Sequence, residues 1–122
     1  MFEIYVEKHF SAAHRLREYN GNCANWHGHN WMVTAFVEAQ EVDELGLAVD
    51  FRKVKQELNE VLDYFDHKNL NELPEFTDKN PTCELIAQLF YRLLSDRLNS
   101  SKLRVSKVRI SETPTTGVTY YE

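Results

Sequence analysis

Residues 23 to 30, CANWHGHN, bring together a cysteine and two histidines, which are side chains able to bind a transition metal. His27 and His29 are two residues apart. In an extended segment both imidazoles therefore point to the same side, and Gly28 leaves space between them. A catalytic zinc site usually takes three protein ligands and keeps one position open. The motif predicts a metal site that needs one more ligand.

The third ligand has two candidates, and Cys23 is a candidate for a fourth. His14 ends the segment FSAAH, and His9 precedes it on the same predicted strand. Cys23 could instead complete a closed Cys-His₃ structural site, which would leave no position for a substrate. Nitrogen ligands favour zinc, although imidazole also suits other divalent metals. The chain contains neither His-x-Glu nor Pro-Cys-x-x-Cys, so a zinc deaminase is not expected.

A second candidate for chemistry is Asp66-His67 in the segment LDYFDHKNLN. A carboxylate beside an imidazole orients the ring and stabilises its charged form. A cysteine near such a pair has a lowered pKa. With Cys23, the pair could form a proton-transfer unit, or the nucleophilic site of a cysteine hydrolase that needs no metal. The same two residues also suit a C-terminal helix cap, because a cationic histidine stabilises that end of the helix dipole.

A third candidate lies in ISETPTTG, where Glu112 and Thr113 come at the end of a predicted strand. A carboxylate facing a pocket can accept two hydrogen bonds from the amidine-like edge of a guanine or pterin ring. The alternative is an exposed acid in a turn. Glu112 is therefore a candidate ring anchor.

The elements that must position these residues follow from the hydrophobic periodicity. Alternating apolar residues predict four strands, over residues 2–7, 31–37, 103–111 and 118–121. Apolar stripes at helical spacing predict one helix from Asp50 to about Phe65 and a second after Asn80-Pro81. This order predicts an α+β fold, with an antiparallel sheet and both helices on one face. The outer strands would be open edges, so we expect a homo-oligomer.

Length and composition limit the class of protein. The 122 residues fit a single domain, over residues 1–122. The net charge of −5 and the absence of a basic cluster argue against nucleic-acid binding. No segment is apolar for long enough to be a signal peptide or a membrane span. Two cysteines without a disulfide framework indicate free thiols in a reducing compartment, so we expect a cytoplasmic protein.

Taken together, six segments resemble the 6-pyruvoyl- and 6-carboxy-tetrahydropterin synthase family. They are FSAAHRL (10–16), CANWHGHN (23–30), VDF (49–51), LDYFDHKNLN (62–71), NPTCE (80–84) and SETPTTG (111–117). The resemblance runs nearly end to end. It implies the tunnelling fold, or T-fold, in which a ββααββ unit forms trimers whose sheets close into a barrel. Two such trimers stack into a hexamer.

The resemblance also implies a role for each candidate residue. The zinc ligands would be His14, His27 and His29. Cys23 would be the catalytic acid/base, completed by His67 and Asp66. The pterin ring would be held by Glu112, with help from Thr113, Thr82, Cys83 and Glu84. In many relatives the position of Cys83 holds serine, threonine or alanine.

The implied substrate is the small molecule 7,8-dihydroneopterin triphosphate, and the spacing around Cys23 bears on the product. Three residues separate Cys23 from His27. This spacing resembles the 6-carboxy enzymes of the queuosine route, which are carbon-carbon lyases releasing acetaldehyde and triphosphate. The 6-pyruvoyl enzymes typically have five residues there. The alternative to an enzyme is a zinc-stabilised binding module in which Cys23 is the fourth ligand. Candidate cations for the triphosphate are Lys8, Arg15 and Arg17.

Overall fold

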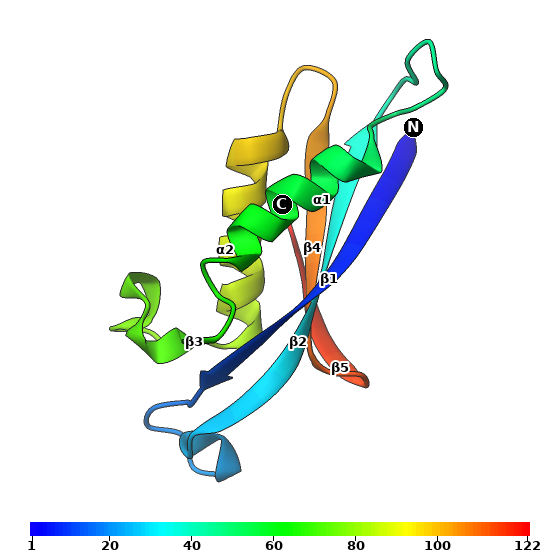
Figure 1. Ribbon diagram of the computed structural model, residues 1–122. Coiled ribbons are helices and arrows are strands. Elements are labelled where there is room, and N and C mark those ends of the chain that lie inside the picture. Colours follow the sequence, from blue (N-terminus) through cyan, green and yellow to red (C-terminus); the bar gives the residue numbers. More distant parts are fainter.

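The computed structural model describes all residues, 1 to 122, and consists of one five-stranded sheet with two helices on one face (Figure 1). The strand order is β3-β1-β2-β4-β5. The elements are β1 (Phe2–His14), β2 (His27–Ala39), α1 (Phe51–Leu62), β3 (Lys68–Asn69), α2 (Cys83–Leu98), β4 (Arg104–Thr113) and β5 (Thr116–Tyr121). Short 3-10 turns are η1 (Asn22–Ala24), η2 (Leu70–Glu72) and η3 (Pro74–Phe76). The predicted α+β order is confirmed.

The strands β1 and β2 form one long antiparallel ribbon, paired from Phe2↔Ala39 to His14↔His27. The predicted start of the second strand, at Trp31, is therefore four residues too late. His27 to Asn30 continue the ladder because each has a partner at the end of β1. This pairing puts the His-Gly-His segment in an extended conformation, as the motif required.

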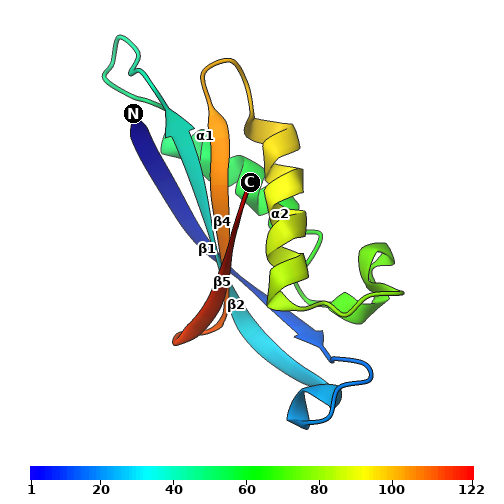
Figure 2. The same ribbon diagram turned by 180° about the vertical axis from the view of Figure 1, so that it is seen from behind.

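The helices cover the face of the sheet on which the apolar residues of the strands gather, as the view from behind also shows (Figure 2). Asp50 caps α1, where its carboxylate accepts a hydrogen bond from Arg52 N at 2.9 Å. Helix α1 ends at Leu62, three residues before the predicted end. Thr82 caps α2 in the same way, through Leu85 N at 3.2 Å. Between helices and sheet, Trp31 and Phe90 are fully buried in the core.

One feature of the sheet differs from the prediction of an antiparallel sheet. The two-residue strand β3 pairs with β1 in parallel, Ala12↔Lys68 and Ala13↔Asn69, so the sheet is mixed at this edge. The segment between the helices is polar and carries no strand periodicity, which is why β3 was not predicted. It brings the residues after Asp66 alongside the end of β1.

Both edges of the sheet are largely open, and the face without helices is polar. Beyond its two pairs with β3, β1 has no partner on its outer side, and β5 pairs only with β4. On the helix-free face, Lys107 Nζ lies 3.3 Å from Glu3 Oε1. On the same face, Thr34 Oγ1 donates to Glu7 at 3.2 Å. Neither helix is long and apolar enough to cross a membrane.

Candidate metal centre and its surroundings

Three histidines meet at the end of the β1–β2 ribbon, on the side that faces the helices. His14 and His27 are partners in the ladder, with ring centroids 4.5 Å apart, and His29 lies 4.9 Å from His27. One ring nitrogen from each of the three comes within 4.8 Å of the others. His9 is exposed and alternates to the opposite face, so the third member of the cluster is His14.

The hydrogen bonds of two of these rings leave one nitrogen of each ring free to bind a metal ion. His14 Nδ1 donates to Pro81 O at 2.8 Å, and His27 Nδ1 donates to Asn25 O at 2.7 Å. Their Nε2 atoms are therefore unprotonated in the neutral ring. The Nε2 atoms of His14 and His29 are buried without any hydrogen-bond partner, which is unusual for buried polar atoms. Imidazoles held from behind by carbonyls fit a divalent metal ion, and a set of nitrogen donors suits zinc.

Burial favours the neutral form of His14 and His29. Removal from water is the main reason that the pKa values of His14 and His29 lie below the ordinary range. For both rings, the nearby carboxylate of Glu112 opposes this shift. Because a metal binds only the neutral imidazole, the lowered pKa values extend binding to lower pH.

Glu112 points from β4 at the histidines, so it is not the exposed turn acid of the alternative interpretation. Its Oε1 lies 3.4 Å from His14 Nε2 and 4.0 Å from His29 Nε2. Cys83, the first residue of α2, is half-buried beside it. Burial, with the Glu112 and Glu84 carboxylates, raises the pKa of the Cys83 thiol to about 12. This thiol therefore stays protonated and is no nucleophile at neutral pH.

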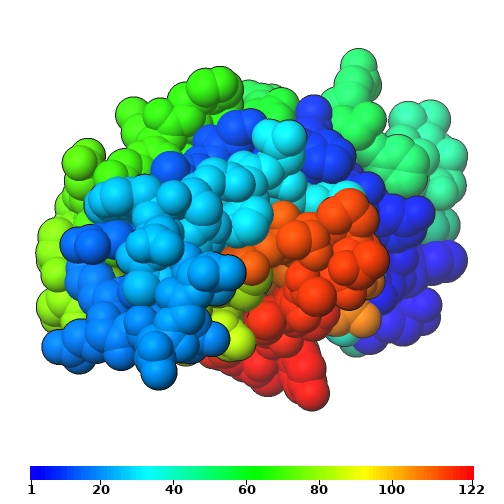
Figure 3. Space-filling view, turned by 90° about the horizontal axis from the view of Figure 1, so that it is seen from below, coloured from blue at the N-terminus to red at the C-terminus, as the bar shows by residue number.

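The other residues predicted to hold a ring make local contacts. The Thr82 hydroxyl caps α2, and the Thr113 hydroxyl lies 2.7 Å from that of Thr116 in the β4–β5 turn. Glu84 is exposed in the first turn of α2. From below, the start of α2 is visible between the loop after β1 and the β4–β5 hairpin (Figure 3). These segments therefore lie around one end of the sheet.

Asp66 and His67 form a pair, but not a helix cap, because α1 has already ended at Leu62 with Asp63 as its C-cap. Asp66 Oδ1 accepts from Ser11 N at 2.9 Å, and its Oδ2 lies 2.9 Å from His67 Nδ1. His67 N donates to Ser11 O at 2.6 Å. Chiefly through the Ser11 hydrogen bond, the pKa of Asp66 is lowered, so the carboxylate is charged and able to orient the ring. His67 itself has a left-handed backbone, with φ of 57°.

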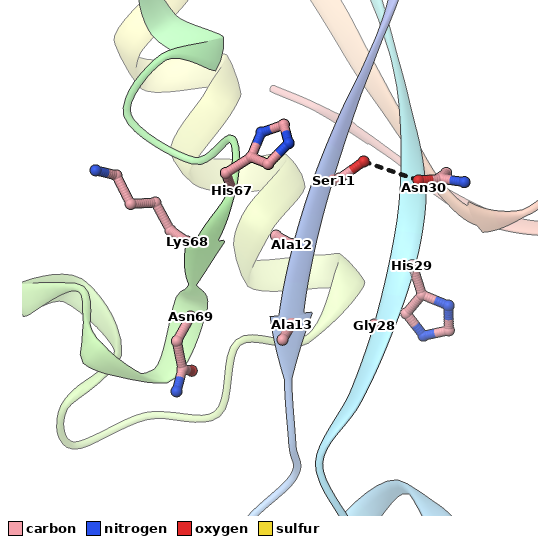
Figure 4. A pocket seen from close by; sticks show the side chains of 9 residues that line it. All are labelled: Ser11, Ala12, Ala13, Gly28, His29, Asn30, His67, Lys68 and Asn69. Atoms are coloured by element: carbon pink, nitrogen blue, oxygen red, sulfur yellow. Dashed lines mark hydrogen bonds between the residues drawn. The ribbon is translucent and has the colours of Figure 1, made fainter.

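A shallow pocket of about 550 Å³ lies along the β3–β1–β2 edge, lined by His67, Ser11, Asn30 and His29 among others (Figure 4). In this view His67 and His29 project to different sides of the β1–β2 ribbon.

Cys23 is exposed on η1, and its thiol makes no hydrogen bond. Within one chain, therefore, two of the three clustered histidine rings meet Glu112, and Asp66 meets His67, but Cys23 joins neither group.

Two of the three candidate cations are already engaged, at least in part. The Arg17 guanidinium donates to Lys79 O at 2.9 Å and Asn71 O at 3.2 Å. Arg15 lies over the Trp26 ring, 4.9 Å from its centroid. Lys8 is half-buried on β1.

The sequence analysis did not predict two hydrogen-bond partners near the site. Pro81 O accepts from His14, and Asn71 pairs with the backbone of Arg15. No local sequence pattern indicates either contact, because the residues meet only when the chain is folded.

Comparison with known proteins agrees with this arrangement. Residues 3–122 match the sequence model of the family named 6-pyruvoyl tetrahydropterin synthase. The fold is thus that of the T-fold pterin synthases. The chain is a member of the 6-pyruvoyl tetrahydropterin synthase family, a family of enzymes.

Relatives with two different names are similar to the chain. A 6-carboxy-5,6,7,8-tetrahydropterin synthase of Bacillus subtilis is 34% identical over 95 residues, covering 74% of this chain and 63% of that protein. A 6-pyruvoyl tetrahydrobiopterin synthase of Dictyostelium discoideum is 32% identical over 98 residues, covering 66% of this chain and 73% of that protein. The solved 6-pyruvoyl tetrahydropterin synthase of Caenorhabditis elegans superposes with a TM-score of 0.87 and 32% identity, over 99% of this chain and 95% of that one.

The histidine cluster predicts the effect of removing a single ring. His29→Ala should lose a bound zinc ion on dialysis, because two imidazoles and no third protein ligand hold it. His9→Ala is the matched control, since it removes an exposed histidine of the same strand pair, and it should retain zinc. Metal content measured by mass spectrometry after dialysis checks both. Equal zinc content in the two variants would contradict the assignment.

Proposed function

We propose that the chain is a zinc-dependent 6-carboxy-5,6,7,8-tetrahydropterin synthase. It would convert 7,8-dihydroneopterin triphosphate to 6-carboxy-5,6,7,8-tetrahydropterin, release acetaldehyde and triphosphate, and serve the synthesis of 7-deazaguanines such as queuosine. The observation that carries the proposal is the cluster of His14, His27 and His29, in which the buried Nε2 atoms of His14 and His29 have no hydrogen-bond partner, together with Cys23, which three residues separate from His27. Two free thiols fit a cytoplasmic enzyme.

Glu112 is assigned to bind the pterin ring of the substrate. A pterin offers adjacent N–H groups, and one charged carboxylate can accept both in a bidentate arrangement. Glu112 lies beside His14, so a ring held there would have its side chain next to the histidines. Thr113 and the segment Thr82-Cys83-Glu84 would help to frame the ring. Because the Cys83 thiol remains protonated, its contribution would be its small size and a hydrogen bond, not proton transfer.

The proton transfers are assigned to Cys23 and to His67 with Asp66. A divalent ion held by His14, His27 and His29 would supply Lewis-acid chemistry that acidifies neighbouring C–H and O–H groups of the substrate. Cys23 is exposed and so can reach a substrate held nearby. The carboxylate of Asp66 holds Nδ1 of the His67 ring, which leaves Nε2 free to give or take a proton.

The separation of Cys23 from His67 supports an active site built from several chains. We infer a hexamer, made of two stacked trimers. The open outer edges of β1 and β5 could pair between neighbouring chains, and the polar helix-free face would then line a barrel. In such an assembly Cys23 of one chain could face His67 of another.

The reaction product decides between the carboxy synthase and the pyruvoyl synthase, which is the alternative because relatives of that name are also similar to the chain. Incubation of the zinc-loaded protein with dihydroneopterin triphosphate should release acetaldehyde and give the carboxy product, identified by mass spectrometry. A pyruvoyl product without acetaldehyde would remove the first assignment. No turnover of this substrate would contradict both.

Replacing Cys23 separates acid/base catalysis from metal binding. Cys23→Ala should retain zinc, because the three imidazoles suffice, while kcat falls by about 10²-fold or more. Zinc content and turnover measured on the same sample check this. If zinc is lost together with activity, the thiol is a fourth ligand, and the result supports the interpretation of the chain as a binding module.

Mixed oligomers test whether the site is shared between chains. Cys23→Ala and His67→Ala chains should each be inactive alone. Co-refolded in equal amounts, they should recover about a quarter of the wild-type activity, because random mixing leaves that share of intersubunit sites intact. Sedimentation analysis should show hexamers for all samples. Monomers, or mixtures that stay inactive, would contradict a shared site.

A further inference from the structure

Two asparagines between the helices make reciprocal hydrogen bonds with the backbone of the loop that carries Cys23. Asn71 Oδ1 accepts from Arg15 N at 2.9 Å, while Asn71 Nδ2 donates to Arg15 O at 3.1 Å. Asn80 repeats this arrangement two residues further along, accepting from Arg17 N at 2.8 Å and donating to Arg17 O at 3.1 Å. Each amide thus imitates a strand partner for one residue of the loop. We call Asn71 and Asn80 the asparagine clamp.

The residue between the two clamped positions holds Cys23 itself. Leu16 N donates to Cys23 O at 2.8 Å, across the loop of residues 15–26. Residues 15 to 17 are therefore fixed on both sides, and their central N–H fixes the main chain of Cys23. Apart from this bond, the backbone bonds around η1 are local ones, from Ala24 N to Gly21 O and from Asn25 N to Asn22 O. The clamp therefore connects the main chain of Cys23 to the segment between the helices, and only Leu16 stands between the clamped residues and Cys23.

The segment that supplies the clamp also holds the other two groups of the site. Pro81 O, next to Asn80, accepts from His14 Nδ1 at 2.8 Å. At its other end, Asp66 accepts from Ser11 N at 2.9 Å. Asn71 is only 6% exposed, so its amide depends on these partners and not on water for its hydrogen bonds. One segment thus sets the position of a metal-binding ring, the His67 pair and the Cys23 loop together.

We propose that Asn71 and Asn80 are positioning residues for Cys23, acting through the backbone of residues 15–17 without touching substrate. This rests on the proposed function, because it presumes that Cys23 takes part in the reaction. The physical basis is that a displacement of about 1 Å in a reacting group can lower the rate by about 10²-fold. Reciprocal amide pairing allows little such displacement.

Asn80→Asp is the main test, because it keeps the size and the acceptor oxygen of Asn80. It replaces the donating amide nitrogen by an oxygen that faces Arg17 O, so the pairing is broken while the volume is kept. Asn71→Ala is the second variant, at the buried half of the clamp. Asn99→Ala is the matched control. Asn99 Oδ1 accepts from Val105 N at 2.7 Å in the α2–β4 turn, which lies at the other end of the molecule (Figure 1).

Hydrogen exchange of peptides from residues 15–26 and steady-state kinetics are measured on the zinc-loaded proteins. Both clamp variants should exchange roughly tenfold faster or more in this loop than wild type, because Asn80→Asp removes one hydrogen bond and Asn71→Ala removes two, with β1 and β2 unchanged. Zinc content and KM should persist while kcat falls about tenfold or more. Asn99→Ala should change neither the exchange of the loop nor kcat.

Three results would overturn the proposal. Unchanged exchange in residues 15–26 would show that the clamp does not hold the loop. Equally faster exchange throughout the sheet would show a general loss of stability. Faster exchange in the loop with an unchanged kcat would show that its position does not matter to the reaction. If wild type itself turns over no dihydroneopterin triphosphate, the proposed function fails, and the catalytic role of the clamp fails with it, while the exchange data still decide whether it holds the loop.

Discussion

The pairing of β1 with β2 through to its last residues is the constraint on which the site depends. It continues to His14↔His27, and so places three imidazoles on the buried side of the ribbon, where they leave two nitrogen atoms without partners. Each buried unpaired polar group costs about 1–3 kcal/mol, and a bound cation would remove that cost. The ladder therefore turns a short motif into a candidate metal site, in which burial favours the neutral form of His14 and His29.

The rest of the molecule holds this end of the ribbon from two sides. Strand β4 brings Glu112 against the histidines, with Cys83 of α2 beside Glu112, while the segment between the helices contacts β1 at Ser11 and the following loop at Arg15. The contacts at Ser11 and Arg15 are hydrogen bonds of side chains to backbone atoms. Such contacts define position more than they add stability, because each contributes only about 0.5–1.5 kcal/mol. The apolar core beneath, around Phe90, supplies the stability.

Part of this architecture could be predicted from the sequence. The order of the elements and the start of α1 at Asp50 follow from periodicity and capping, which are local. The second helix was predicted to open at Asn80-Pro81, whereas its cap is Thr82, two residues after Asn80. The choice of His14 over His9 came from the family resemblance, and alternation along β1 gives its physical reason. The strand start at His27 was missed because His-Gly-His-Asn has no strand propensity, and only pairing with β1 makes it extended. The parallel strand β3, Asp66 on Ser11, and Asn71 on Arg15 join residues distant in sequence, so no local pattern could reveal them.

The central claim is that three imidazoles bind one zinc ion while the sulfur of Cys23 stays out of its coordination sphere. X-ray absorption at the zinc edge of the resting, zinc-loaded protein tests this directly, because sulfur and nitrogen ligands differ in distance and scattering. The expected spectrum contains only nitrogen and oxygen scatterers at about 2.0–2.1 Å. A sulfur contribution at about 2.3 Å, or zinc bound in no defined site, would contradict it.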